Sequence, residues 1–430
     1  MLQKNAILIS SLDDTNLIID NKEKDKFALD YSIILNSKTN IGYFFNNIPA
    51  NLASLPISVA RSWYRNSDNI DTHNLQYSSG MLLEKRICFM ISNTIKFYYS
   101  FAELTKQYET IEVPCNYPEF LGKIVNIFKK NIKLIPEQPY SKDLDILINQ
   151  RAIIKKVKVS KYSPIFRFLQ KPFIKLIRNR TIVFPDWTYE DQKNKNYLRQ
   201  NGLNIFNSFY YKEIDKKNSV NTSRQLKINT DIIQSILSKY NVKSSDSHNL
   251  LILIQDIISI EYFASIETLK QQYFVMENLI NYYKPLKVII PDDGEYPFYN
   301  MLMQITSKFK IESVSVIDGY VMHLDLDQIR VKEDGVSPLV DKYATMGSLS
   351  HKMVGSVYPK YKRVLIKAPL LSYLPNKIKS KKMYDALIMM SIPSIMNPNS
   401  RWDMRSKYVI DVIKCLKSMK IDKIGVKIKP

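Results

Sequence analysis

The sequence is poor in the residues that build disulfide frameworks, metal centres and short-period repeats. It has three cysteines, four histidines and ten glycines in 430 residues. Cys88, Cys115 and Cys415 are odd in number and far apart, which excludes a disulfide framework or zinc knuckle and favours a reducing compartment. The histidines lack metal-ligand spacing, so no metal is expected. The scarcity of glycine and the lack of a fixed-period repeat argue against collagen-like, solenoid and propeller architectures.

Long apolar runs are also missing. The longest uninterrupted aliphatic run, Leu250–Ile254, is far shorter than the roughly 20 residues that cross a bilayer. The first apolar run, 6–9, is too short for a signal-peptide core and is soon followed by Asp13 and Asp14. Hydrophobic residues make up 45% and charged residues 24%, as in ordinary globular proteins. We therefore expect a folded cytoplasmic protein that neither spans a membrane nor is exported.

Positive charge exceeds negative charge by a wide margin. The chain has 62 Lys plus Arg against 41 Asp plus Glu, which gives a formal net charge of +21. Lysine is frequent throughout the chain, which a codon bias of the whole genome would also produce. The location of the charge is therefore more informative than its total. From Arg151 to Pro185 there is no acidic residue, and ten basic residues alternate there with bulky apolar ones. This basic-apolar segment, residues 151–180, suits the surface of an anionic leaflet. A solvated face leading into a core helix is the open alternative. Nucleic-acid binding is not expected, because no recognition motif accompanies the charge.

Strand-like and helix-like periodicities alternate along the chain, which predicts an α/β fold with parallel sheets. The clearest unit is a strand at 287–290, a turn at 291–295, a helix at 299–309 and a strand at 313–317. A lysine- and proline-rich stretch at 358–382 is interpreted as a connector. The other predicted strands are 5–10, 31–35, 109–113, 181–184, 384–390 and 423–428, and the other predicted helices are 78–108, 119–129, 231–240, 250–283 and 404–419.

Three carboxylates surround one glycine in the turn after the predicted strand 287–290. In parallel sheets, ligands bind outside the carboxyl ends of strands. Asp292, Asp293 and Glu295 are close enough in sequence for mutual repulsion to raise one pKa, which favours a general base. Capping of the following helix is the competing interpretation, and it explains one carboxylate better than three.

Two further turns are weaker candidates. Asp318 and Gly319 follow the next strand, at the same predicted sheet edge, although an ordinary Asp-Gly turn is an equal alternative. Gly355 and Ser356 form a turn that could present N–H groups and a hydroxyl to a phosphate. The fingerprints of dinucleotide-binding proteins, P-loop enzymes and serine hydrolases do not occur.

This arrangement of turns resembles the GT-B glycosyltransferases of bacterial surface-polysaccharide synthesis, above all CMP-sugar-using sialyltransferases and Kdo transferases. Asp292-Asp293-Gly294 is similar to the acidic-acidic-Gly motif whose carboxylate activates the acceptor hydroxyl. Asp318 stands where related enzymes often carry a His before Gly319, and Gly355-Ser356 looks like their Gly-x-Pro turn. The stretch 427–430 is similar to their Lys-x-His-Pro motif, with Lys429 in place of the histidine expected to contact the donor phosphate.

The resemblance implies two Rossmann-like domains: an acceptor-binding domain at 1–365, a linker at 366–382, and the start of a donor-binding domain at 383–430 that looks incomplete. It implies metal-independent transfer of a sugar from a nucleotide donor, possibly CMP-activated, to a surface glycan or lipid-linked acceptor. Lys427 and Lys429, with Gly319, Gly355 and Ser356, would contact the donor. Residues 151–180 would hold the enzyme at the cytoplasmic leaflet. The alternatives are a non-catalytic membrane-associated scaffold, a glycerophosphotransferase and a sugar-nucleotide epimerase.

Overall fold

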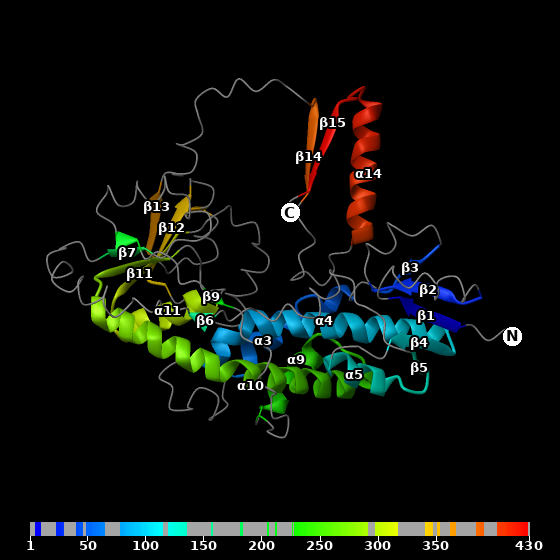
Figure 1. Ribbon diagram of the computed structural model, residues 1–430, viewed down its shortest axis with the longest axis horizontal. Helices are drawn as coiled ribbons and strands as arrows, with labels where there is room; N and C mark the ends of the chain where they lie inside the picture. The colour runs from blue at the N-terminus through cyan, green and yellow to red at the C-terminus, as the bar shows by residue number, and fades with distance from the viewer. Residues whose placement is uncertain are drawn as a thin grey trace.

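Two parallel β-sheets, together with the long helices that run from one sheet to the other, make up most of the described fold (Figure 1). The computed structural model describes residues 5–9, 23–29, 40–45, 49–64, 78–114, 119–135, 156–157, 181–183, 204–205, 211–212, 226, 228–290, 297–316, 340–346, 351–352, 362–366, 384–390 and 402–428.

The first sheet has five strands, and every neighbouring pair in it is parallel. The strands are β1 (Asn5–Ile9), β2 (Asp25–Ala28), β3 (Gly42–Tyr43), β4 (Thr110–Pro114) and β5 (Ile132–Ile135). Their order, β3-β2-β1-β4-β5, is that of a Rossmann-like sheet, and it reverses direction between β1 and β4. Residues 6–9 of β1 are buried throughout, as expected for a parallel strand covered on both faces.

The second sheet has six parallel strands. They are β7 (Thr181–Val183), β8 (Asn204–Ile205), β10 (Lys287–Ile290), β11 (Glu312–Val316), β12 (Lys342–Met346) and β13 (Lys362–Ile366). Their order is β13-β12-β11-β10-β7-β8, so the first strand of this sheet lies between the second and the third. This is the flavodoxin-like doubly wound order with an added strand, and its switch point lies between β7 and β10.

Long helices connect the two sheets through one continuous core. The helices are α3 (Leu55–Ser62), α4 (Ser79–Gln107), α5 (Glu119–Ile127), α9 (Thr230–Lys239), α10 (Ser244–Tyr283) and α11 (Pro297–Lys308), with a short 3-10 helix, η1 (Ala50–Leu52). Helices α4 and α10 lie side by side (Figure 1). The hydrophobic core cluster runs from Ala6 and Leu8 of the first sheet to Val288 and Ile290 of the second. Both parallel sheets, from β1 at Asn5 to the end of β13 at Ile366, thus lie around a shared core.

One stretch of α10, Ser244–Ile266, is long and apolar enough to cross a membrane by length and composition. Half of its most apolar window is buried within the fold, and core helices of globular proteins have the same length and composition. Leu253, Ile254 and Ile258 of this stretch belong to the core cluster. The stretch therefore serves here as the central packing helix.

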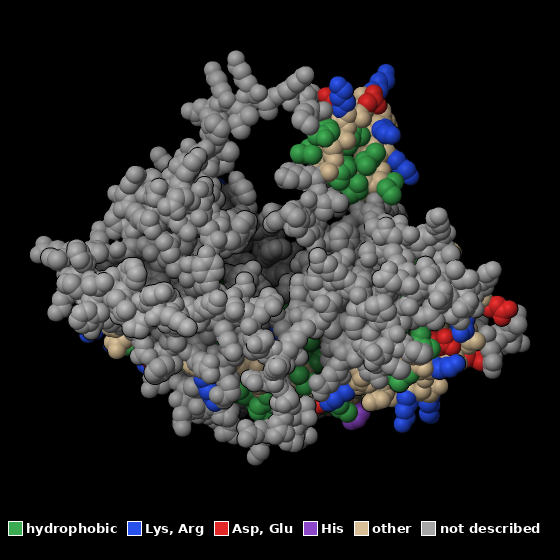
Figure 2. Space-filling view, in the orientation of Figure 1, with side chains coloured by type: hydrophobic (Ala, Val, Ile, Leu, Met, Phe, Trp, Pro, Cys, Tyr) green, Lys and Arg blue, Asp and Glu red, His purple; other side chains and the backbone are tan. Residues whose placement is uncertain are grey.

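The C-terminal elements form a smaller parallel unit made of β14 (Ala386–Met390), α14 (Trp402–Ser418) and β15 (Ile424–Ile428). None of its described residues belongs to the core cluster of the two larger sheets. Tyr384, Leu387 and Val426 are 43–53% exposed and contribute to the apolar surface of this unit (Figure 2).

One short strand of the basic-apolar segment is described. This strand, β6 (Lys156–Val157), pairs in antiparallel orientation with β9 (Tyr211–Lys212).

Most predicted elements are confirmed within two residues at their ends, and the parallel α/β fold is as expected. The prediction of a connector at 358–382 is wrong in part, because β13 lies within this range. Val364, Leu365 and Ile366 form an apolar strand between lysine-rich flanks. Helix α10 begins at Ser244, six residues before its predicted start. The predicted strand 31–35 lies outside the described residues.

Candidate functional site

The strands that precede the acidic turns meet at one sheet edge. β10 ends at Ile290 and β11 ends at Val316, and these parallel neighbours pair Ile290 with Ser315. The chain therefore leaves both strands at the same carboxyl edge. β10 also borders the switch point, since β7 is its other neighbour. This carboxyl edge is where doubly wound sheets bind ligands.

Most of the candidate side chains themselves lie outside the described residues: Asp292, Asp293, Glu295, Asp318, Gly319, Gly355, Ser356 and Lys429. Lys427 differs from these residues because its backbone is described: it lies in β15 and pairs with Met389 of β14. The structure thus brings together the strands before the two acidic turns, and it places Lys427 in the separate C-terminal unit.

Helix α11, which follows the acidic segment 291–296, makes its polar contacts with the start of α4 through Gln304. The Oε1 atom of Gln304 accepts a hydrogen bond from the N–H of Ser78 at 2.8 Å, and its Nε2 lies 3.3 Å from the Ser78 carbonyl oxygen. The same Nε2 donates to Oδ1 of Asn300 at 2.7 Å. Ser78 is the N-cap of α4, and its hydroxyl accepts from the N–H of Met81 at 3.3 Å. We call residues 78–86, which are the N-cap and first two turns of α4, together with their partners, the α4 junction.

Two ion pairs continue the α4 junction into the protein interior. Nε of Arg86 donates to Oε2 of Glu261 on α10, and both side chains are more than nine-tenths buried. Nε of Arg61 on α3 lies 3.8 Å from Oε2 of Glu84. Buried charges are tolerated when they are paired, so these contacts require α3, α4 and α10 to keep their positions along one another.

A close approach of two helices also shapes the α4 junction. The hydroxyl of Tyr64, just after α3, donates to Oε1 of Glu84. The Tyr64 ring covers Gly80 so closely that a Cβ there would lie 2.2 Å from Cγ of the ring. Only glycine fits at this position, and the end of α3 is therefore held against the first turn of α4.

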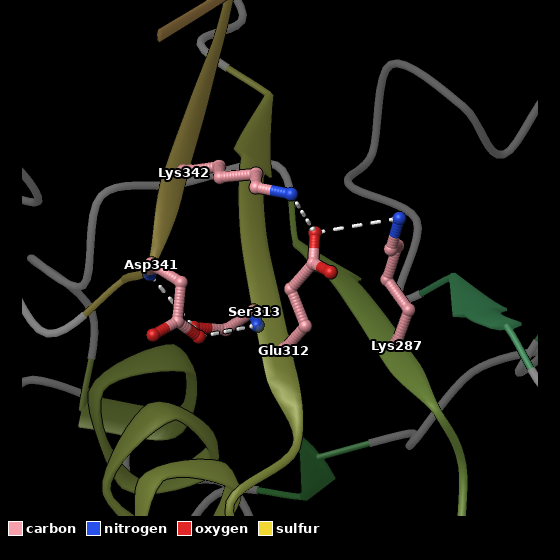
Figure 3. A network of polar contacts seen from close by, with 5 residues as sticks. All are labelled: Lys287, Glu312, Ser313, Asp341 and Lys342. Atoms are coloured by element: carbon pink, nitrogen blue, oxygen red, sulfur yellow. Dashed lines mark hydrogen bonds and ion pairs between the residues drawn. The ribbon is translucent and has the colours of Figure 1, made fainter. Parts of the chain in front are cut away.

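The opposite, amino edge of the second sheet carries a polar network (Figure 3). Oε1 of Glu312 lies 2.7 Å from Nζ of Lys342 and 3.3 Å from Nζ of Lys287. The contact with Lys342, aided by that with Lys287, lowers the pKa of Glu312 below its ordinary value. Oδ2 of Asp341 accepts hydrogen bonds from the N–H and hydroxyl of Ser313 at 2.7 and 3.0 Å. These groups pair with one another, so their arrangement serves strand alignment.

Tyrosine–carboxylate contacts join α4 to α10 and to β2. Burial, together with the nearby carboxylate of Asp246, raises the pKa of Tyr98 to about 12, although a hydrogen bond from Asn249 opposes the rise. The Tyr98 hydroxyl donates to Oδ1 of Asp246 at 3.0 Å. Burial and the contact with Asp25 raise the pKa of Tyr108 to about 12. These tyrosines are protonated near neutral pH and act as hydrogen-bond donors in the packing of α4.

Within the described part of the chain, no group of three or more His, Cys, Asp or Glu residues could hold a metal ion. Sequence reasoning missed the α4 junction. Ser78 before a periodic helix is a readable N-cap signal, whereas its partner Gln304 is 226 positions away and carries no signal of its own. Searches against protein-family models, curated proteins and solved structures find no match to this chain.

Proposed function

We propose that the protein is a GT-B-type glycosyltransferase that moves a sugar from a nucleotide donor to a hydroxyl of a surface glycan or lipid-linked acceptor. One observation carries this proposal: the segment with Asp292 and Asp293 directly follows β10, the strand that borders the switch point of a doubly wound parallel sheet. The resemblance of Asp292-Asp293-Gly294 to the acidic motif of sialyltransferases supports the same assignment.

In the proposed reaction, the acceptor oxygen attacks the anomeric carbon and the bond from that carbon to the donor phosphate oxygen breaks. The acceptor proton passes to the carboxylate of Asp292 or Asp293, which acts as the general base. The nucleotide leaves with both electrons of the broken bond, and nearby lysines and N–H groups stabilise its negative charge. Glu295 and Asp318 would tune the pKa of the base by charge repulsion.

The donor would be held by Lys427 and Lys429 of the C-terminal unit and by the turns that contain Gly319, Gly355 and Ser356. The basic-apolar segment 151–180 would hold the enzyme on an anionic membrane surface, close to lipid-linked acceptors. No step of this proposal uses a metal or another cofactor.

The test is product formation from a panel of CMP- and UDP-sugars with the purified chain. We expect Asp292→Asn combined with Asp293→Asn to lower kcat by at least about 10²-fold, the usual contribution of a general base. Glu103→Gln, which removes an exposed carboxylate of α4, is the matched control and should retain activity. Equal turnover by the double variant and by the unmodified chain would defeat the catalytic assignment. Absence of both turnover and saturable CMP or UDP binding would favour the non-catalytic alternative instead.

A further inference from the structure

We infer that Gln304 is a positioning residue for the acidic segment after β10, and this inference rests on the proposed function. Gln304 is not expected to touch substrate. It acts by fixing the start of α11 on the cap of α4, and thereby fixes one end of the segment that holds Asp292 and Asp293.

The connection along the chain is short. The acidic segment, residues 291–296, lies between Ile290, the last residue of β10, and Pro297, the first residue of α11. Ile290 is buried in the core and paired with Ser315, so the first end of the segment is held by the sheet. The direction and position of α11 therefore determine where the second end lies.

The first turns of α11 are held by a chain of polar contacts. Asn300, the fourth residue of the helix, is 7% exposed and accepts from Nε2 of Gln304 at 2.7 Å. Gln304 lies one turn further on and contacts both the N–H and the carbonyl oxygen of Ser78. Its amide thus uses its acceptor and both of its N–H donors, which makes its orientation unique.

The partner of Gln304 belongs to the other half of the molecule. Ser78 caps α4, which connects β3 to β4 of the first sheet and is joined to α10 by the Arg86–Glu261 pair. The edge of the second sheet at which the acidic segment begins is therefore positioned relative to the first sheet. Loss of the Gln304 contacts removes these hydrogen bonds from Ser78 and Asn300 and loosens the first turns of α11, which then depend more on apolar packing.

Two substitutions of Gln304 separate this role from simple stability. Gln304→Leu removes all three contacts, whereas Gln304→Glu keeps an acceptor for the Ser78 N–H and loses the donors. We expect hydrogen exchange of amides 301–304, the first whose helical acceptors lie within α11, to accelerate about tenfold in Gln304→Leu and less in Gln304→Glu. Ser307→Ala, at an exposed position of the same helix, should leave exchange unchanged.

The kinetic measurement is the pH profile of kcat for transfer, normalised to the folded fraction. A displaced base should lower kcat by up to about 10²-fold and move the acidic limb of the profile by about one pH unit. Both effects should be larger in Gln304→Leu than in Gln304→Glu. Simple destabilisation would leave that limb in place. Unchanged exchange at amides 301–304, or faster exchange with an unmoved acidic limb, overturns the inference. If the unmodified chain transfers no sugar, the proposed function fails instead, and the exchange data still decide whether Gln304 holds α11.

Discussion

Glu312 of β11 lies within ion-pair distance of Lys342 on one neighbouring strand and of Lys287 on the other, at 2.7 and 3.3 Å. These three residues are the first residues of β11, β12 and β10, so one carboxylate links three strands at the amino edge of the second sheet (Figure 3). Ligands bind at the carboxyl edge of such sheets, and polar groups at the amino edge are available for alignment.

Glu312→Gln should weaken the protein slightly and only above the pKa of the carboxyl group. The folded-state pKa of Glu312 lies below its unfolded value of 4.5, so its stabilisation is present above that pH and is lost as the pH falls through the folded-state pKa. The pair is partly exposed, and we expect a loss of about 0.2–1 kcal/mol at pH 7 that disappears at lower pH. Urea unfolding from pH 3 to pH 7 measures it, with Glu109→Gln at an exposed position as the control. An equal loss at every pH would contradict the ion-pair explanation.

Removing one partner of the Arg86–Glu261 pair should be far more costly, because the remaining charge is buried and loses this ion pair. We expect Glu261→Leu to lower the free energy of unfolding by about 3–5 kcal/mol. Adding Arg86→Met should recover most of that loss, since well-packed apolar residues often replace a buried ion pair without cost. Chemical unfolding of the two single variants and the double variant measures the coupling.

The double variant also tests whether the pair sets the alignment of α4 with α10. Recovered stability with a changed crosslinking pattern between the two helices would show that the ion pair specifies their register. Recovered stability with the original pattern would assign the register to the apolar core alone. Lys106→Gln, an exposed change near the end of α4, controls for nonspecific effects.

Local patterns predicted elements well, and long-range contacts were not readable. The periodicity of residues 78–108 and 287–317 gave helices and strands close to those observed, because each pattern reports burial on one face. β2 and β3 were missed, since four- and two-residue strands are stabilised by their neighbours rather than by their own composition. The order of the two sheets and the contact of Ser78 with Gln304 depend on residues far apart in the chain. The acidic turns themselves stay predictions, because only the strands before them, β10 and β11, lie within the described residues.

Tyr98→Phe should flatten the alkaline loss of stability. Burial raises the pKa of Tyr98 from 10.0 to about 12, so its contribution is complete below pH 10 and is lost as the pH rises towards 12. Over that window the dependence of unfolding free energy on pH should decrease by about 1.4 kcal/mol per pH unit, the value for one proton. Urea unfolding between pH 9 and pH 11.5 measures the slope. An unchanged slope in Tyr98→Phe would assign the alkaline loss to other groups.

The basic-apolar segment should provide most of the affinity for anionic membranes. Lys171, Lys175 and Arg178 lie in a stretch without acidic residues, and each basic residue near an anionic leaflet contributes about 1 kcal/mol. Replacing these three by Glu should lower binding to phosphatidylglycerol vesicles at least about 100-fold in co-sedimentation, with little binding to phosphatidylcholine vesicles in either form. The matched control places the same charge change at three lysines in and just after α14, Lys414, Lys417 and Lys420, whose side chains are exposed. A similar loss in both variants would show that binding follows net charge rather than this segment, and would remove the membrane role from residues 151–180.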